Sequence, residues 1–173
     1  MNIRKAYFED LDAIEKIYDD IHTAEENGIM TIGWIRDVYP VRKTAEAAIE
    51  RDDLFVMEDR GKTVGAAIIN TIQVDVYAGA PWQYPGDDGV CVLHTLVISP
   101  SETRRGYGEA FVGFYETLAR NSGLPELRID TNARNTAARK MYAKLGYKEI
   151  TTVPTVFNGI PGVDLVLLEK HLD

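Results

Sequence analysis

The chain has 173 residues, 45% of them hydrophobic and 27% charged, and its formal net charge is −8. This size and composition are typical of one globular domain over residues 1–173 with a core of its own. The acidic balance excludes general nucleic-acid binding, because no basic stretch is large enough to neutralise a run of phosphates. No window is long and apolar enough to cross a membrane, and the single cysteine forms no disulfide framework. We therefore expect a cytoplasmic protein without membrane attachment.

The first half of the chain predicts one strand, two helices and a strand hairpin. Apolar residues recur at helical spacing in LDAIEKIYDDIHTAEE, and a run rich in Gly, Pro and aromatic residues indicates a long loop. The expected elements are a strand over 3–7, helices over 11–26 and 43–53, strands over 54–59 and 63–74, and a loop over 75–89.

The second half alternates strands and helices before a closing hairpin. The expected elements are strands over 90–98 and 126–131, helices over 109–123 and 135–146, and two last strands over 147–157 and 162–170. This order predicts a mixed α/β fold rather than a doubly wound parallel sheet.

The stretch TRRGYGEAF (103–111) follows the strand over 90–98 and leads into a helix. A strand, a glycine turn and a helix N-terminus commonly bind phosphate through backbone N–H groups. A P-loop is excluded, since it needs four residues between its glycines and a following Gly-Lys-Ser/Thr. A dinucleotide fingerprint is disfavoured because Phe111 stands where its third glycine belongs, although Asp130 lies near the ribose-binding position. A tight turn without a ligand is the remaining alternative.

Two separated motifs resemble one protein family. The residues that carry the resemblance are Ile98-Ser99-Pro100, Gly106-Tyr107-Gly108, Asn135, Ala138, Tyr142 and Lys144-Leu145-Gly146-Tyr147. Over roughly residues 90–150 the chain resembles the GNAT superfamily of acetyl-CoA-dependent N-acetyltransferases. The resemblance implies a central, mostly antiparallel mixed sheet of about six or seven strands flanked by about four helices. Thr103 departs from the pattern, since the family usually has Gln or Arg at this position.

The resemblance also implies that acetyl-CoA is the co-substrate and which residues bind it. The pantetheine arm is expected to pair with the backbone of Leu96, Val97 and Ile98, which requires their strand to splay from its neighbour. The pyrophosphate is expected over the turn formed by Thr103, Arg104, Arg105, Gly106, Tyr107 and Gly108. We expect Arg104 or Arg105 to replace the anchor missing at Thr103, the alternative being that both are solvated surface arginines.

Tyr142 and His94 are the expected catalytic residues. Asn135 and Tyr142 share one helix face, and the resemblance implies that Tyr142 protonates the departing CoA thiolate. Asn135 either contacts the cofactor arm or only caps its helix. His94 is a candidate base because its unperturbed pKa suits proton transfer near neutrality. A water chain and the carboxylates of Asp87 and Asp88 are the alternatives.

Other kinds of catalysis are not expected. Cys91 lies in an apolar strand without a paired base, so we reject a covalent intermediate on its thiol. No His, Cys and Asp residues have the spacing of metal ligands, so no metal is expected. His22 and His171 are expected to be ordinary surface residues.

The acceptor is expected to be a small molecule with a primary amine. Its pocket is expected among the segments 29–40, 76–89 and 155–163, with walls from Trp34, Tyr39, Trp82, Tyr84 and Phe157. These aromatic side chains can instead pack on the sheet or on a partner subunit. A peptide or protein amine is the alternative acceptor, and a non-catalytic acyl-CoA sensor is the alternative function. Members of the family commonly form dimers, so the resemblance also allows a homodimer.

Overall fold

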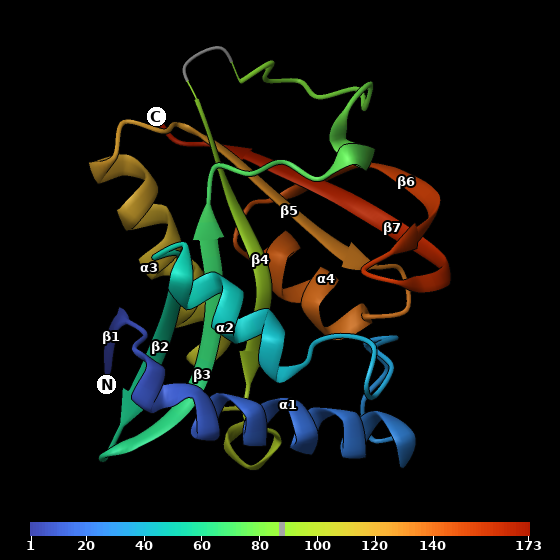
Figure 1. Ribbon diagram of the computed structural model, residues 1–173. Helices are drawn as coiled ribbons and strands as arrows, with labels where there is room; N and C mark the ends of the chain where they lie inside the picture. Colours follow the sequence, from blue (N-terminus) through green and yellow to red (C-terminus); the bar gives the residue numbers. More distant parts are fainter. Residues whose placement is uncertain (87–88) are drawn as a thin grey trace.

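The computed structural model describes residues 1–86 and 89–173, which form a seven-stranded sheet with helices on both faces (Figure 1). Across the sheet the strands follow in the order β1 (Asn2–Lys5), β2 (Leu54–Asp59), β3 (Lys62–Asn70), β4 (Val90–Ile98), β5 (Glu126–Asn132), β7 (Ile160–His171) and β6 (Lys148–Phe157). The neighbours β4 and β5 are parallel, and the other neighbouring pairs are antiparallel. The expected mixed, mostly antiparallel sheet is confirmed.

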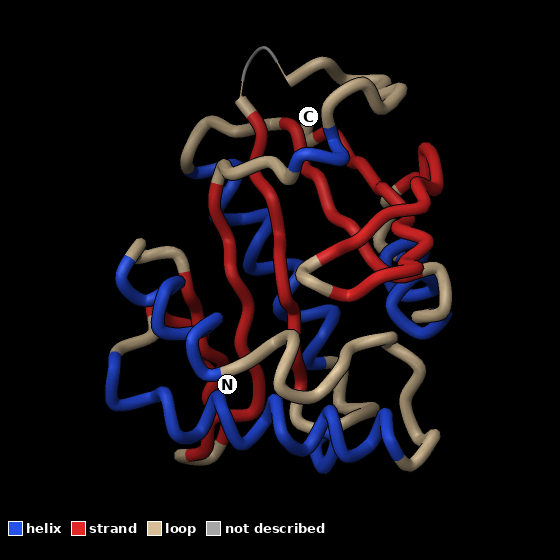
Figure 2. The backbone as a smooth tube through the Cα atoms, turned by 45° about the vertical axis from the view of Figure 1, so that its right-hand side comes forward, coloured by secondary structure: helices blue, strands red, loops and turns tan. Residues whose placement is uncertain are grey.

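Helices cover both faces of the sheet (Figure 2). On one face lie α1 (Leu11–Glu26) and α2 (Arg42–Glu50), and on the other lie α3 (Tyr107–Asn121) and α4 (Thr136–Lys144). Three short 3₁₀ turns complete the fold: η1 (Phe8–Asp10), η2 (Asp75–Tyr77) and η3 (Pro100–Glu102). None of the described helices is long and apolar enough to cross a membrane.

Several boundaries differ from the sequence-based expectations by a few residues, and two of the differences have a clear local reason. The helix α2 ends at Glu50 rather than at 53, because Asp52 adopts the left-handed conformation with a φ of +60°. The strand β3 ends at Asn70 rather than at 74, because Asn70 Oδ1 accepts the N–H of Ile72 at 2.9 Å and turns the chain. The bounds of α1 and β4 agree with the sequence patterns.

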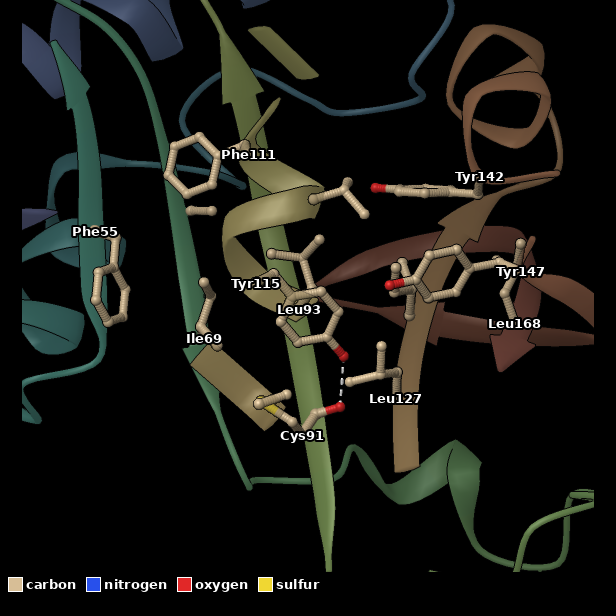
Figure 3. Close-up of a cluster of buried hydrophobic side chains, with 14 of the residues drawn as sticks. Phe55, Ile69, Cys91, Leu93, Phe111, Tyr115, Leu127, Tyr142, Tyr147 and Leu168 are labelled. Carbon is tan, nitrogen blue, oxygen red and sulfur yellow. Dashed lines mark hydrogen bonds between the residues drawn. The ribbon is translucent and has the colours of Figure 1, made fainter. Parts of the chain in front are cut away.

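The core between the sheet and the helices α3 and α4 is rich in aromatic side chains (Figure 3). Tyr115 of α3 is fully buried, and its Oη donates a hydrogen bond to Cys91 O at 2.6 Å, which satisfies the buried phenol. Tyr142 of α4 and Tyr147 pack edge to face, with ring centroids 5.8 Å apart. This packing fixes α3 and α4 over β4 and β5, the two strands that border the site.

A long loop covers the opposite face of β5 and β7 and is fastened to them by two charged side chains. Arg128 of β5 donates a hydrogen bond to Tyr84 O at 3.0 Å, and its guanidinium carbon lies 4.0 Å from the centroid of the Trp82 ring. The carboxylate of Glu169 on β7 accepts backbone N–H groups from the same loop. Because these groups are buried and paired, residues 71–86 are held against the sheet rather than over solvent.

Candidate active site

The strands β4 and β5 pair over only half the length of β4. Val90–Leu93 pair with Glu126–Ile129, whereas β4 continues to Ile98 and β5 to Asn132 without further pairing between them in the described chain. The backbone of β4 beyond Leu93 therefore has free N–H and C=O groups on the side of β5. This is the splay that the pantetheine arm requires.

A β-bulge in β4 lies where the strands separate. Ala66 pairs with Val97 and Ile68 with His94, so two residues, Thr95 and Leu96, face the single residue between them on β3. Thr95 has a φ of +49°, and its hydroxyl hydrogen-bonds the phenol of Tyr39 from the loop 29–40. The bulge thus turns a side chain of β4 toward the loop that covers this face.

A cavity of about 520 Å³ occupies the gap between β4 and β5. Tyr142, on its border, belongs to the core beneath α3 and α4, whereas Asp130 is bonded to Tyr77 of the core on the opposite face. The cavity therefore reaches both faces of the sheet. We call the part bordered by residues 102–109 and α4 the cofactor end. The acceptor end is the part bordered by residues 30–39 and 157–165, together with Val74 and Asp130 on the same face of the sheet.

The turn at the cofactor end leads directly into α3, which begins at Tyr107, two residues earlier than expected. Arg104 and Gly106 adopt left-handed conformations with φ of +64° and +76°, and Gly106 is the N-cap residue. The first N–H bonded within the helix belongs to Ala110, which donates to Gly106 O at 2.9 Å. The preceding N–H groups are therefore available to a ligand, as expected for a phosphate-binding helix N-terminus.

Gly108 lies against the neighbouring helix α4. A Cβ atom at this position would lie 2.9 Å from Met141 Sδ, so the flexible end of the Met141 side chain would have to shift. A Cβ at Gly106 would meet no atom, so Gly106 is favoured there by its positive φ and not by its size. The two glycines thus differ in what they contribute to the turn.

The side chains of this turn are not equivalent. Thr103 Oγ1 donates to Pro100 O at 3.3 Å, and Arg105 forms an ion pair with Glu102 at 3.1 Å. Arg104 borders the cavity, and no ion-pair partner for it exists among the described residues. Of the two arginines, Arg104 is therefore the one placed to meet an anion in the cavity.

Asn135 and Tyr142 both border the cavity from α4. Asn135 is the helix N-cap, and its Oδ1 accepts the N–H of Ala138 at 3.2 Å, so its Nδ2 remains a donor for a ligand. Tyr142 is 5% exposed and its phenol extends from α4 toward β4 (Figure 3). Burial, followed by the negative charge of Asp130, raises the pKa of Tyr142, so its phenol keeps its proton at neutral pH.

Asp130 is the acidic residue that the sequence-based search for a base missed. It lies near the end of β5 on the border of the cavity, and its Oδ2 accepts a hydrogen bond from Tyr77 Oη at 2.8 Å. Dense packing around the carboxyl raises the pKa of Asp130 to about 6, because burial disfavours its charged form. The signal was an acid that follows the alternating apolar residues Leu127 and Ile129 of β5, which the sequence analysis considered only as a ribose ligand.

His94 also borders the cavity, on β4. Its Nε2 lies 3.1 Å from both Asn70 Oδ1 and Ile72 O. Both partners are acceptors, since Asn70 donates its amide to Asp53 at 2.8 Å, so Nε2 carries the proton and Nδ1 is the basic nitrogen. Burial lowers the pKa of His94 and keeps the ring neutral near pH 7. Asp87 and Asp88, the other candidates, lie outside the described residues.

The aromatic residues expected around the acceptor divide into two groups. Trp34, Tyr39 and Phe157 border the cavity. Trp82 and Tyr84 do not, because Trp82 packs on Tyr77 and Arg128 and Tyr84 stacks on His171. These two side chains fasten the loop to the sheet, which was the alternative interpretation.

The remaining candidate residues serve the fold. His22 is 3% exposed rather than a surface residue, and its Nε2 contacts Pro40 O at 2.9 Å. His171 is also not free in solvent, because its Nδ1 lies 3.0 Å from Glu126 Oε1. Burial raises the pKa of Cys91 to about 12, so its thiol is not a nucleophile. Among the residues that the structure describes, no three His, Cys, Asp or Glu side chains gather as a metal site.

The cavity has an unpaired strand edge, a helix N-terminus with free N–H groups at one end, and titratable side chains near the strand gap. This geometry suits an acyltransferase. The sequence of residues 11–147 matches the model of the Acetyltransferase (GNAT) family. The chain belongs to this family and is an acetyltransferase. No curated protein matches the sequence.

Solved structures share the whole fold at low sequence identity. An acetyltransferase of the GNAT family from Streptococcus agalactiae has a TM-score of 0.80 at 23% identity, covering 99% of this chain and 95% of that one. The protein yncA from Salmonella typhimurium, solved with its cofactor acetyl-CoA, has a TM-score of 0.71 at 21% sequence identity, and the match covers 100% of this chain and 94% of that one. The ribosomal-protein-S18-alanine N-acetyltransferase from Escherichia coli has a TM-score of 0.69 at 20% sequence identity, and the match covers 99% of this chain and 94% of that one.

Proposed function

We propose that this acetyltransferase moves the acetyl group of acetyl-CoA directly to a primary amine of a small molecule. The observation that carries the proposal is the cavity through the sheet, with a buried phenol on its cofactor side and two titratable side chains, Asp130 and His94, on its acceptor side. Neutral amines react and ammonium ions do not, so a group that accepts a proton is needed beside the acceptor.

The residues at the cofactor end fit acetyl-CoA. The free backbone edge of Leu96, Val97 and Ile98 suits the amide-rich pantetheine arm, and the turn 103–108 suits the pyrophosphate. Arg104 adds a charge-assisted contact to phosphate, and Asn135 Nδ2 adds a donor to the arm. When bound, acetyl-CoA supplies an activated thioester.

In this mechanism Asp130 accepts the proton of the acceptor ammonium, directly or through water, and His94 Nδ1 is the second candidate base. The amine nitrogen forms a bond to the acetyl carbon, the carbon–sulfur bond breaks, and Tyr142 donates its proton to the departing thiolate. The second proton leaves the nitrogen to give the neutral amide and, directly or through water, restores the phenol of Tyr142. Asp130 suits its part because its raised pKa remains below neutrality, so it is ionised and ready to accept. Cys91 takes no part, since its thiol keeps its proton.

A small acceptor is favoured over a peptide by the closure of the acceptor end. Thr31 Oγ1 donates to Arg134 O at 3.3 Å, and a Cβ on Gly159 of the β6–β7 turn would lie 3.4 Å from Val38. The loop 29–40 thus contacts the elements on the far side of the site. The similar fold of the ribosomal-protein-S18-alanine N-acetyltransferase keeps a protein N-terminus as the alternative acceptor.

The test combines ligand binding with turnover. We expect acetyl-CoA and CoA to raise the melting temperature and NAD to leave it unchanged, because the turn fits the phosphates of CoA and lacks the third glycine of a dinucleotide site. Thiol release in an amine library then identifies acceptors. Absence of a shift with acetyl-CoA would contradict the proposal. A cytoplasmic location and a homodimer remain predictions for fractionation and sedimentation measurements.

A further inference from the structure

The acceptor end of the cavity is mostly apolar. Trp34, Val74 and Phe157 border it, together with Ile160 and Leu165, which are buried members of the core. Removing the apolar body of a ligand from water against such a wall is favourable, and the side chains are already held by the core and need little ordering.

The charge at this end is negative. Asp130 is the one ionised side chain bordering the acceptor end among the residues described, and no Lys or Arg side chain borders that end in the same part of the chain. Arg128, two residues earlier on β5, is turned away by its bonds to Gln73 and Tyr84 and by its contact with Trp82.

The phenol hydroxyls of Tyr39 and Tyr77, the tyrosines nearest to this end, already form hydrogen bonds within the protein. Tyr77 donates its hydroxyl proton to Asp130 at 2.8 Å, and the hydroxyl of Tyr39 is paired with that of Thr95. A carboxylate or phosphate on the acceptor would therefore be buried beside a like charge, with no cation to pair with it. Such burial is strongly unfavourable.

We propose that the acceptor is a primary amine with an apolar body and without a carboxylate or phosphate, an alkylamine or arylalkylamine rather than an α-amino acid. Its ammonium group faces Asp130, and its apolar body lies against Trp34 and Phe157. This inference rests on the proposed function and narrows its substrate class.

The experiment compares two amines that differ by one carboxylate. Phenylethylamine and phenylalanine are offered at equal concentration with acetyl-CoA, and kcat/KM is measured by thiol release. We expect phenylethylamine to be favoured by at least about 100-fold, since no Lys or Arg side chain borders the described acceptor end to pair with the carboxylate. A peptide with an N-terminal alanine is the third acceptor, and it is expected to react as poorly as phenylalanine.

A pair of variants tests whether charge sets this preference. Val74→Arg adds a cation at the border of the acceptor end, and Val74→Gln adds a polar chain of comparable length without charge. We expect Val74→Arg to lower the preference for phenylethylamine by about tenfold and Val74→Gln to leave it nearly unchanged.

The outcomes distinguish a failure of this inference from a failure of the proposed function. Equal or better turnover of phenylalanine would overturn this inference and leave the proposed function standing. Equal or better turnover of the peptide would overturn this inference and replace the small-molecule acceptor by a protein N-terminus. Thiol release with other amines of the library but not with phenylethylamine would overturn this inference alone. Thiol release with no amine of the library, while acetyl-CoA still raises the melting temperature, would overturn the proposed function and this inference with it. An equal response of both Val74 variants would contradict the role of charge.

Discussion

The two ends of the cavity are built differently. The cofactor end comes from two short stretches of chain: β4 with the start of α3, and β5 with the start of α4. The acceptor end combines segments that lie far apart in the sequence, around residues 30–39, Val74 and residues 157–165. The cofactor end offers mainly backbone groups whose positions follow from a strand gap and a helix N-terminus. The acceptor end offers side chains held by contacts between distant segments, such as Tyr77 with Asp130. A fixed co-substrate and a variable acceptor suit these two ways of building a site.

The largest expected effect concerns Tyr142, on the cofactor side of the cavity. Tyr142→Phe should lower kcat by about 100- to 1000-fold, because the leaving thiolate loses its proton donor. The affinity for CoA should be unchanged, since the ring and its packing are kept. Isothermal titration and thiol release measure the two quantities.

Tyr147→Phe is the matched control for that change. Tyr147 packs against Tyr142 in the same core and does not border the cavity, so its substitution should leave turnover within about twofold. Equal losses in both variants would indicate a structural effect and remove the role of Tyr142 as an acid.

The next effect tests the acceptor end. The raised pKa of Asp130 predicts that kcat/KM falls as the pH drops through about 6, because protonation removes the base. Asp130→Asn should lower kcat/KM at pH 8 by about 100-fold and abolish this acidic limb. A limb that persists in Asp130→Asn would transfer the role to His94, and His94→Gln would then remove it.

A smaller effect tests the cofactor end. Arg104→Ala should weaken CoA binding by about tenfold, with a loss that shrinks at high salt, because one charge-assisted contact to phosphate disappears. Arg105→Ala is its control, since Arg105 is paired with Glu102 and does not border the cavity, and it should change the Kd by less than about threefold. The reverse order of the two losses would show that Arg105 is the anchor.

The smallest effect concerns stability. The pKa of Asp130 is raised by folding, so its carboxylate costs stability above about pH 6, and this cost disappears as the pH falls toward the unfolded-state pKa. Asp130→Asn should therefore be more stable than the natural chain by about 1–2 kcal/mol at pH 8, with the difference vanishing near pH 4. Urea unfolding at both pH values measures it, and a difference independent of pH would contradict the burial of a charged carboxylate.

The residue patterns determined most of the fold and the cofactor end. Helical spacing predicted α1 with its bounds, the apolar run predicted β4, and the spacing of Gly106, Gly108, Asn135 and Tyr142 indicated the turn and the helix face that border the cavity. These features depend on neighbours within a few residues, so local backbone preferences suffice to encode them.

Only the tertiary structure decided the acceptor end. Asp130 is a candidate base only in the folded chain, where Tyr77, 53 residues earlier, packs against its carboxyl and donates a hydrogen bond to it. Trp82 lies outside the cavity because its ring packs against Arg128 on the sheet. Burial, which sets the pKa of a carboxylate and the partners of a guanidinium, is a property of packing between distant segments, and no local pattern specifies it.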